Sequence, residues 1–595
     1  MDALRLAVPA RIPNPGAAGF LNPARLKAWI AALPLGNPIK TSEELLKALQ
    51  LVNRTETGAA QRYQFLDQCR PLLADLLEAQ YKQYATATLP LADKQRTCAE
   101  LVHGLLGEMA CGYKIVILAM AEFPRKDAAH NVLVASAVYA MHYLARLLVD
   151  IYALYAPEPK HLWLELHQLY SLAEQQGFLT ATLPPEIKDI GVRPVEHAYR
   201  RILMLALVSP YHLMQGEAQL VFRELDNWAG TCRLSPLAPG TSPKGHLYVD
   251  LESDAPPRYV PAHSNPPPPV NGRILDISAI MPILEQRSRE LLTSSKTESG
   301  QLNLAGRKLR NMYKRLNEAW GVRAERLSVR RQKATPVEIV VGVSACHHFA
   351  SDGAEFNPEI AEIELRRGKG TGRGEGLSLM AVGDTPWVHE DQVQRLTTGI
   401  VQPRTSQFAE REQDRDIWVK VYSTKLEFSQ KKVEPNSQSF ASVTCQLRNE
   451  SRGGMAITCR KVQSLRLAAG EVIGFKSDQS PSAADWSIGV VRWLRATPPD
   501  RLDVGIGALA DDTLPVATRG VKGIGKDSEY FRSLLIPKMD PLQYPTTLIT
   551  PASVYDVDSV VVVNTGTRLF YAKLIRLADA TNAYSLFQFQ VVDEP

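Results

Sequence analysis

The sequence predicts a multidomain α+β protein, with an all-α amino-terminal region, a carboxy-terminal antiparallel β-barrel and a further small β domain. Three observations lead to this prediction. The chain has 595 residues, enough for about four domains of ordinary size. Apolar residues recur at helical spacing up to about residue 230. From Val337 onward the apolar period changes to two, which is typical of β-strands.

The composition is that of a soluble globular protein, because 45% of the residues are hydrophobic and 22% are charged. These values exclude wholesale disorder and collagen. Seven cysteines without a CxxC pair exclude a disulfide scaffold and favour reduced thiols, so we expect a cytoplasmic protein. The amino terminus has no apolar stretch after a basic start, and we therefore do not expect a secretory signal.

The best candidate for a membrane span, Val132 to Ala153, is expected to be a buried helix instead. His142, Arg146 and Asp150 interrupt it at intervals of four residues, which places all three on one face of a helix. This pattern is typical of an amphipathic helix in a soluble domain rather than of a span. We therefore expect no membrane span.

Residues 1–233 are expected to form a helical domain. Thr41 and Glu44 make a capping box before a run of apolar residues at helical spacing. Residues 234–272 are rich in Pro, Ser and Gly and are predicted to be a linker, with at most a short strand over 247–251. Helix resumes over 273–335. Further helices of the first domain are predicted over 63–84, 94–122, 128–156 and 161–176.

The rest of the chain is predicted to be rich in strands. Residues 336–400 are expected to be a mixed β and irregular region, 401–519 a small barrel and 520–595 a small β domain. Short alternating segments separated by Gly, Asn, Asp and Pro are typical of such barrels. The predicted strands are 337–343, 362–365, 418–422, 443–447, 455–459, 471–475, 486–494, 502–509, 560–563, 569–574 and 584–592.

The most informative motif lies between two predicted barrel strands and contains Asn449, Ser451 and Gly454. Gly454 allows a ligand to approach the backbone, while the Asn449 amide and the Ser451 hydroxyl place polar groups at the end of a strand. By itself the pattern is that of an ordinary turn. Its weight comes from a resemblance to a known family.

The Asn-x-Ser-x-x-Gly pattern is similar to the (D/N)xSxxG signature of PilZ domains, which bind cyclic di-GMP on a six-stranded barrel. Three later segments, 467–473, 486–493 and 503–509, resemble the same family in the expected order. The resemblance covers residues 405–510. It implies a PilZ-like barrel with cyclic di-GMP as its ligand, without a cofactor or a metal.

The other half of the PilZ signature is an RxxxR arm, which Arg411 and Arg415 match. Arginine can hold phosphate oxygens with two parallel donors, offer a fork to a guanine edge, or stack on a purine. Arg448 and Arg452 form a second RxxxR that overlaps the turn and could hold the phosphates instead. In a third interpretation, Arg411 and Arg415 simply lie on a solvated helix face within a charged run.

Three other motifs carry less weight. Residues 520–527 nearly spell a phosphate-binding loop, but Asp replaces the Ser or Thr that would hold Mg²⁺, so we predict a linker. The glycines of 368–376 are not followed by a helix pattern and indicate a hairpin loop. His347 and His348 follow Cys346, yet in a strand they would face opposite sides and could not share a metal. No nucleophile motif or paired-carboxylate signature is found, so we expect a binding protein and no enzyme.

A basic stretch lies between Leu304 and Lys333, where ten Lys or Arg residues stand against Glu318 and Glu325. Clustered positive charge attracts phosphates, so the stretch is a candidate nucleic-acid interface. Its apolar residues recur at helical spacing, however, which favours a packed amphipathic helix with a solvated basic rim. We therefore do not expect a nucleic-acid partner.

Together these features predict a cytoplasmic cyclic di-GMP receptor that relays binding to a helical region facing an unidentified protein partner. Among long PilZ proteins, the architecture resembles the FimW type, which is tied to type IV pili and surface attachment. Ordering of the arginine arm on ligand capture is the mechanism that the resemblance implies. Two alternatives stay open: a degenerate PilZ-fold adaptor that binds only protein, and a nucleic-acid-binding protein that uses residues 304–333.

Overall fold

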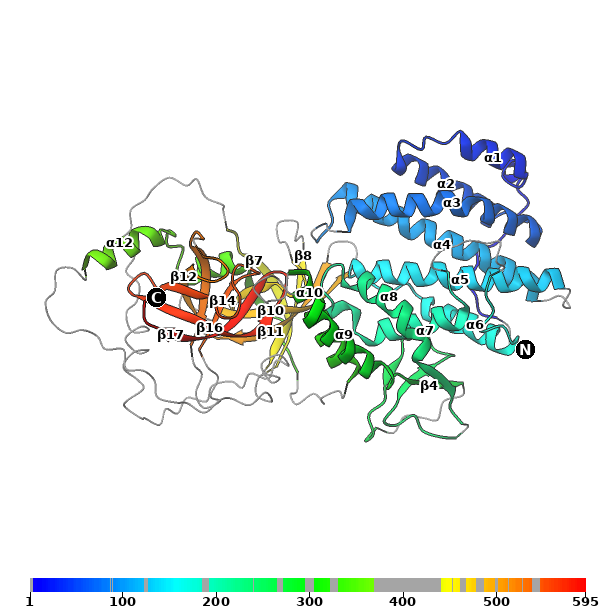
Figure 1. The fold of residues 1–595 in the computed structure, drawn as a ribbon. Helices are drawn as coiled ribbons and strands as arrows, with labels where there is room; N and C mark the ends of the chain where they lie inside the picture. The colour runs from blue at the N-terminus through cyan, green and yellow to red at the C-terminus, as the bar shows by residue number, and fades with distance from the viewer. Residues whose placement is uncertain are drawn as a thin grey trace. The chain divides into compact units, whose positions relative to one another are not determined.

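The computed structural model describes residues 4–85, 87, 89–121, 127–183, 192–238, 240–264, 271–294, 304–321, 330–368, 440–451, 453–460, 467–477, 486–497, 501–511, 513–526, 528–537 and 546–594. The chain divides into two compact units (Figure 1). Unit 1 contains residues 1–301 and 312–323, and unit 2 contains residues 302–311 and 324–595. Helices dominate the first and strands the second, so the predicted α+β fold class is confirmed.

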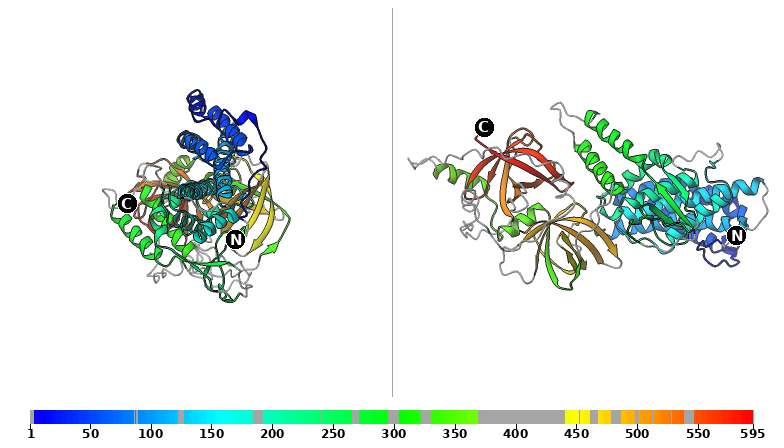
Figure 2. Two further views of the ribbon diagram at one scale, coloured as in Figure 1. Left: turned by 90° about the vertical axis from the view of Figure 1, so that its right-hand side faces the viewer. Right: turned by 90° about the horizontal axis from the view of Figure 1, so that it is seen from below.

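Unit 1 is built mainly from helices that pack as neighbouring hairpins (Figures 1 and 2). Short connections between long helices favour antiparallel neighbours, and α4 packs against α2, α3 and α5. The elements are η1 (Pro15–Ala17), α1 (Pro23–Ala31), α2 (Pro38–Asn53), α3 (Ala59–Tyr84), α4 (Asp93–Ala121), α5 (Asp127–Ala153), α6 (Leu162–Gln175), α7 (Val195–Leu207), η2 (Pro210–His212), α8 (Glu217–Trp228) and η3 (Ala229–Thr231).

Helix α2 begins ahead of the predicted capping box. Asn37 is its N-cap, since the Asn37 side chain accepts a hydrogen bond from Lys40 N at 3.2 Å, and Pro38 takes the first helical position. Thr41 is buried inside the helix, where its hydroxyl donates to Pro34 O at 2.7 Å. The asparagine–proline pair is therefore the start signal, and Thr41 instead fixes the preceding loop.

Helices α4 and α5 form the centre of the helical domain. Both are long and apolar enough to cross a membrane by length and composition, over Asp93–Met120 and His130–Ala153. Of their most apolar windows, 72% and 78% are buried inside the protein. The stacked rings of Tyr113, Tyr139 and Tyr143 join the two helices. The apolar surface of α5 is thus covered by other helices, as the sequence predicts.

A small antiparallel sheet occupies the region predicted to be a linker. Its strand order is β1-β4-β2-β3, and it buries Tyr248, Val249 and Leu251. β2 matches the short strand predicted over 247–251, whereas the other three strands are too short to show a clear alternation among the prolines and serines. They are β1 (Arg233–Pro236), β2 (Leu247–Asp250), β3 (Arg258–Tyr259) and β4 (Gly272–Asp276).

The predicted helical segment 273–335 contains α9 (Ile280–Ser294) and, in its basic stretch, α10 (Leu304–Trp320). Arg315 of α10 forms an ion pair with Glu217 of α8. One face of α10 is buried through its apolar residues, which are Met312, Tyr313, Leu316 and Trp320. This is the packing that the amphipathic pattern predicts.

Unit 2 contains a closed antiparallel barrel of six strands. The ring runs β7-β6-β9-β10-β11-β8 and closes through the pairing of β7 with β8. The short strand β5 pairs with Asn449 and Glu450 near the carboxyl end of β7. Closure leaves no open strand edge within the ring. The strands are β5 (Arg331–Gln332), β6 (Pro336–Val341), β7 (Val443–Ser451), β8 (Gly454–Arg460), β9 (Val472–Ser477), β10 (Ser487–Thr497) and β11 (Arg501–Ala510).

This barrel takes one strand from the region predicted to be a separate middle part. β6 lies within residues 336–400, yet it pairs with β7 on one side and β9 on the other. The barrel is therefore interrupted in the sequence, and the predicted boundary at residue 401 is corrected. The predicted strand 418–422 lies outside the described residues.

Two helices follow β6 where the sequence predicts strands and loops. They are α11 (Val343–Ala350) and α12 (Pro358–Gly368), so the strand predicted over 362–365 is wrong. Gly342 makes the sharp turn from strand to helix with a φ of 95°, a backbone conformation that other residues rarely adopt. Of the predicted glycine loop 368–376, only its first residue is described, as the end of α12.

A second closed barrel of unit 2 runs β12-β13-β14-β17-β16-β15. Its first strand starts at residue 514, so the predicted boundary at residue 520 and the predicted linker are corrected. A Cβ on Gly520 would lie 2.0 Å from Gly525 O, which explains the glycine-rich sequence at the end of this strand. The strands are β12 (Leu514–Lys522), β13 (Phe531–Ile536), β14 (Thr547–Pro551), β15 (Val560–Asn564), β16 (Leu569–Ala580) and β17 (Tyr584–Val592).

One hydrophobic cluster joins the two barrels of unit 2. Helix α11 supplies part of it, and both barrels contribute residues to the same continuous contact. Burial of this apolar surface stabilises the two barrels as one packed body. Representative members are Val340, Val343, Ala345, Val472, Ile488, Leu534, Ile549 and Tyr584.

Cys445 of β7 and Cys459 of β8 form a disulfide, which corrects the expectation that all thiols are reduced. Their Cα atoms are 4.6 Å apart, because the register places them opposite each other beside the pair Gln446–Thr458. A missing CxxC pair says nothing about such a contact, which depends on strand register. The free cysteines are Cys69, Cys98, Cys111, Cys232 and Cys346.

Candidate functional site

The hairpin between β7 and β8 holds the described part of the predicted ligand site. Asn449 pairs with Ala456 across the hairpin and with Gln332 of β5 on its other side. Its side-chain amide is partly exposed and makes no hydrogen bond within the described part of the chain. The Ser451 hydroxyl donates to Gly454 O at 3.2 Å and so closes the turn. The hairpin therefore presents one uncommitted amide beside a fixed turn.

Gly454 has a structural reason to be glycine. Its φ is 149°, and a Cβ at this position would lie 2.0 Å from Ile506 O on β11. Strand β8 therefore passes against β11 at a distance that only glycine permits. The sequence interpretation, that Gly454 lets a ligand approach the backbone, is not needed to explain this residue.

Arg448 already has a partner in the barrel. Its Nη1 lies 3.2 Å from Asp503 Oδ2, and the same carboxylate receives hydrogen bonds from Arg501 Nε at 3.1 Å and Thr458 Oγ1 at 2.6 Å. Arg448 occupies the irregular position between Leu447 and Asn449 in the β7–β8 register. It is thus held towards β11, and binding a phosphate would compete with Asp503. Alternation in β11 could have pointed to Asp503, because it is a buried carboxylate in an apolar strand.

The remaining arginines of the predicted site, Arg411, Arg415 and Arg452, lie outside the described residues. Arg411 and Arg415 lie between Gly368 of α12, where the described chain ends, and Phe440 ahead of β7, where it begins again, whereas Arg452 lies between the described residues Ser451 and Gly453. Both ends belong to unit 2. The structure therefore brings together Asn449, Ser451, Gly454 and Arg448, and the position of the arginine arm stays a prediction.

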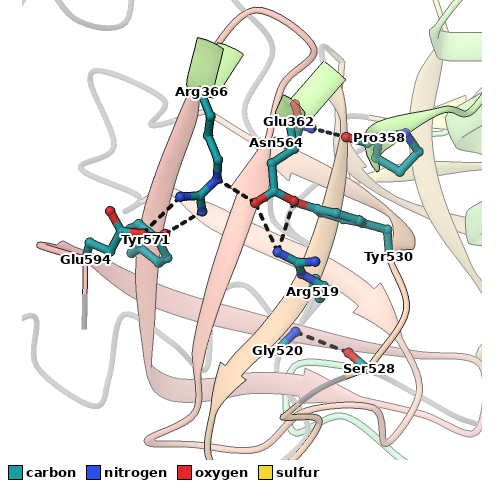
Figure 3. A network of polar contacts seen from close by, with 10 residues as sticks. All are labelled: Pro358, Glu362, Arg366, Arg519, Gly520, Ser528, Tyr530, Asn564, Tyr571 and Glu594. Atoms are coloured by element: carbon teal, nitrogen blue, oxygen red, sulfur yellow. Dashed lines mark hydrogen bonds and ion pairs between the residues drawn. The ribbon is translucent and has the colours of Figure 1, made fainter. Parts of the chain in front are cut away.

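Helix α12, which leads into residues 369–439, is fixed on the second barrel by a polar network around Glu362 (Figure 3). Arg519 Nη2 lies 3.1 and 3.0 Å from the two Glu362 carboxylate oxygens, and Tyr530 donates its hydroxyl at 2.8 Å. Burial raises the pKa of Glu362, but the hydrogen bonds from Tyr530 and Arg366 and the charge of Arg519 leave it below its ordinary value.

Arg366 extends this network to the edge of the barrel (Figure 3). It contacts Glu362 at 2.9 Å through Nε, the Tyr571 hydroxyl at 3.1 Å through Nη2 and Glu594 at 3.3 Å through Nη1. Asn564 Nδ2 also donates to Pro358 O at 2.9 Å at the start of α12. Helix α12 is thus tied at both ends, which fixes the point from which the chain leads towards the predicted arm.

The candidate metal motif around Cys346 belongs to the packed body. Cys346 to His348 lie in helix α11, so the interpretation as part of a strand is wrong. Burial raises the pKa of the Cys346 thiol, and burial together with the charge of Arg532 lowers the pKa of His347 to about 3. The His347 ring packs against Phe356 at 5.3 Å. Within the described residues, no group of three or more metal-binding side chains is found.

Three family models match consecutive parts of the chain. The model "Cyclic-di-GMP receptor FimW, N-terminal domain" matches residues 24–239, and "Cyclic-di-GMP receptor FimW, middle PilZ domain" matches residues 247–515. The model "FimW C-terminal beta-barrel domain" matches residues 516–592. Their limits agree with a first barrel that includes β6 and a second that begins with β12.

A curated relative matches along almost the whole chain. This chain is 26% identical over 599 residues to the cyclic-di-GMP receptor FimW of Pseudomonas aeruginosa, and the match covers 98% of this chain and 93% of that protein. No solved structure matches the chain.

Fold and hairpin together define the class: a PilZ-domain protein with a helical amino-terminal domain and a second, carboxy-terminal barrel. The chain belongs to the FimW family of such proteins. The resemblance predicted from the Asn449 motif is therefore confirmed, as is the predicted similarity to the FimW type.

Proposed function

We propose that this protein is a cyclic di-GMP receptor that binds its ligand at the β7–β8 hairpin of the PilZ barrel. The observation that carries the proposal is the Asn449 amide, which stands uncommitted beside a fixed turn in the barrel that matches a PilZ model. An amide can both donate to and accept from a guanine edge, so it suits a ligand with two guanine bases.

In this proposal Arg411 and Arg415 supply the phosphate contacts. Cyclic di-GMP carries two phosphates, and guanidinium groups bind phosphate oxygens through parallel hydrogen bonds. Arg448 is the weaker candidate, because its guanidinium is held by Asp503 at 3.2 Å. Arg452 remains an alternative that the same experiment separates from the arm.

We further infer that ligand capture is relayed to the helical domain, which would contact a protein partner and so control type IV pili or surface attachment. The support is the full-length match to a FimW receptor. In this proposal the protein binds a ligand and is not an enzyme. We also propose that the protein is cytoplasmic. Its two long apolar helices are mostly buried inside the protein, which favours a soluble protein without a membrane span.

A calorimetric titration of cyclic di-GMP into the full chain tests the proposal. We expect micromolar or tighter binding, and a loss of at least about 100-fold in Arg411→Ala/Arg415→Ala, since each lost charge-assisted contact costs roughly 1.5–3 kcal/mol. Binding retained in this double variant and lost in Arg452→Ala would move the phosphate contacts to the turn. No binding to the wild-type chain would contradict the receptor and favour the adaptor alternative.

The nucleic-acid alternative receives little support from α10. Its apolar face is buried and Arg315 pairs with Glu217, so much of the helix serves packing. If the basic segment bound nucleic acid, affinity would fall steeply with salt and would survive deletion of residues 400–595.

A further inference from the structure

Between residues 133 and 152, the central helix α5 of the helical domain is open to solvent at a single place. From Leu133 to Tyr152, every residue of α5 is buried except His142 and Arg146. These two residues are four apart, so they lie on the same face, one turn from each other. We call His142 and Arg146 the α5 window.

Positive charge surrounds the α5 window. Helix α5 packs against α3 and α4 on one side and against α7 and α8 on another. Burial, then the charges of Arg146, Arg201 of α7 and Arg70 of α3, lower the pKa of His142 to about 3. The imidazole is therefore neutral near pH 7 and can take part in hydrogen bonds.

The acidic residues around the window are already engaged. Asp150 accepts hydrogen bonds from the Tyr84 hydroxyl at 2.9 Å and is 2.8 Å from His103 Nε2. On α8, Asp226 pairs with Arg201 at 3.1 Å and with Arg193 at 2.6 Å. These carboxylates therefore have limited capacity to neutralise a further cation.

Asp67 is likewise paired with Arg70 on α3. Arg146, in contrast, makes no hydrogen bond or ion pair within the described part of the chain, although its side chain is exposed. Burial lowers the pKa of Arg146, while Tyr143, Asp150 and Tyr84 raise it. An exposed guanidinium that has no ion pair in the protein can pair with an incoming anion without giving up another partner.

We propose that the α5 window is a docking site for an acidic segment of a protein partner, with one carboxylate held by the Arg146 guanidinium and contacted by His142. The planar guanidinium matches a carboxylate through two parallel hydrogen bonds. One accessible turn of a helix fits a single side chain of a partner, whereas a nucleic acid needs a row of cations along its backbone. The proposal rests on the proposed function only in taking the helical domain as the partner-facing part.

Fluorescence anisotropy with a labelled hexaglutamate peptide and the full chain tests this site without cyclic di-GMP. The matched variants are Arg146→Gln and Arg25→Gln, which remove the same charge; Arg25 is exposed on α1, away from the window. We expect saturable binding to the wild type, at least about 10-fold weaker binding to Arg146→Gln, and a change of less than about twofold in Arg25→Gln. Absence of saturable binding, or equal losses in both variants, would overturn the proposal.

The ring ¹⁵N signals of His142 give a second readout that does not depend on a substitution. They should move on addition of hexaglutamate and saturate at the affinity measured by anisotropy, because the peptide carboxylate lies beside the ring. Arg146→Lys keeps the positive charge but loses the two parallel donors of the guanidinium. This variant should therefore bind hexaglutamate more tightly than Arg146→Gln and more weakly than the wild type. Peptide binding without a change at His142 would place the peptide elsewhere and contradict the site. Cyclic di-GMP titrations are unaffected by either result, so the two proposals fail separately.

Discussion

The two barrels of unit 2 are alike in construction but differ in the polar groups that they present. Each is a closed ring of antiparallel strands, and each uses a glycine where a Cβ would meet a carbonyl oxygen at 2.0 Å, Gly454 in one and Gly520 in the other. The first barrel is interrupted in the sequence between β6 and β7, and its β7–β8 hairpin presents the free amide of Asn449. The second is continuous and presents a network that holds α12.

This difference shows that closure supplies rigidity, whereas function depends on what is inserted into a barrel or attached to it. The second barrel fills its own interior with apolar side chains and shares a further cluster with the first. Arg519 of this barrel forms an ion pair with Glu362 of α12. In the first barrel the Asn449 side chain makes no hydrogen bond within the described residues. The second barrel is thus packed against the first and holds α12.

The strongest test of the shared framework is a pair of glycine substitutions. Gly454→Ala and Gly520→Ala should each lower the free energy of unfolding by about 4 kcal/mol, because the new Cβ collides with backbone. Both should shift one common transition in denaturant unfolding, since one hydrophobic cluster joins the barrels. Gly107→Ala, in helix α4 with nothing within 4 Å, is the control and should stabilise its helix by up to about 1 kcal/mol. Separate transitions for the two barrels would break the comparison.

The network at α12 should give the next largest effect. Glu362→Ala leaves Arg519, Arg366 and Tyr530 without their common acceptor and should cost about 3 kcal/mol of unfolding free energy. Glu364→Ala removes an exposed carboxylate from the same helix and should change stability by less than about 0.5 kcal/mol. Chemical denaturation of both variants measures the difference. Equal effects would show that the network does not hold α12.

Glu471, at the start of β9, should make the stability of unit 2 depend on pH. Burial raises the pKa of Glu471 to about 7. The folded state then binds more protons than the unfolded state between the ordinary pKa of 4.5 and about 7, so stability falls as pH rises through this range. From pH 5 to 8 the loss should be about 2 kcal/mol, measured by denaturation at a series of pH values. Glu471→Gln should flatten the profile, and an unchanged slope in that variant would assign it to another group.

Arg448→Ala should have the smallest effect. The side chain is 49% exposed, and Asp503 keeps its hydrogen bonds from Arg501 and Thr458, so the cost should be below about 1 kcal/mol. Cyclic di-GMP affinity should change by less than about threefold, as in the control Arg460→Ala at the far end of β8. A loss of cyclic di-GMP affinity of tenfold or more, measured by calorimetry, would show that Arg448 leaves its ion pair with Asp503 and binds phosphate.

Much of the fold can be predicted from the periodicity of the apolar residues, and the errors of that prediction have a common cause. The spacing of apolar residues predicts the long helices and most strands within a few residues, because each pattern is local. Ring closure by β6, the disulfide of Cys445 with Cys459 and the sheet around Tyr248 depend on strand register and contacts between distant segments. Helix α11 was hidden because it is short and follows a strand directly at Gly342.

The candidate site likewise has features that local sequence predicts and features that depend on distant contacts. The motif predicts the turn at Ser451 and the partly exposed polar side chain of Asn449 at the strand end, because both follow from local sequence. The engagement of Arg448 depends on Asp503 in a strand further along the chain, and no pattern around Arg448 reveals it. The crowding behind Gly454 is likewise a contact with β11 that local sequence does not contain.

Hydrogen–deuterium exchange of the full chain with and without cyclic di-GMP tests the central claim most directly. We predict slower exchange on ligand binding in peptides that cover the β7–β8 hairpin, residues 443–460, and in peptides that contain Arg411 and Arg415. Peptides from β14 and β17 of the second barrel should not change. Protection confined to α10, or no protection at the hairpin despite measured binding, would contradict the account.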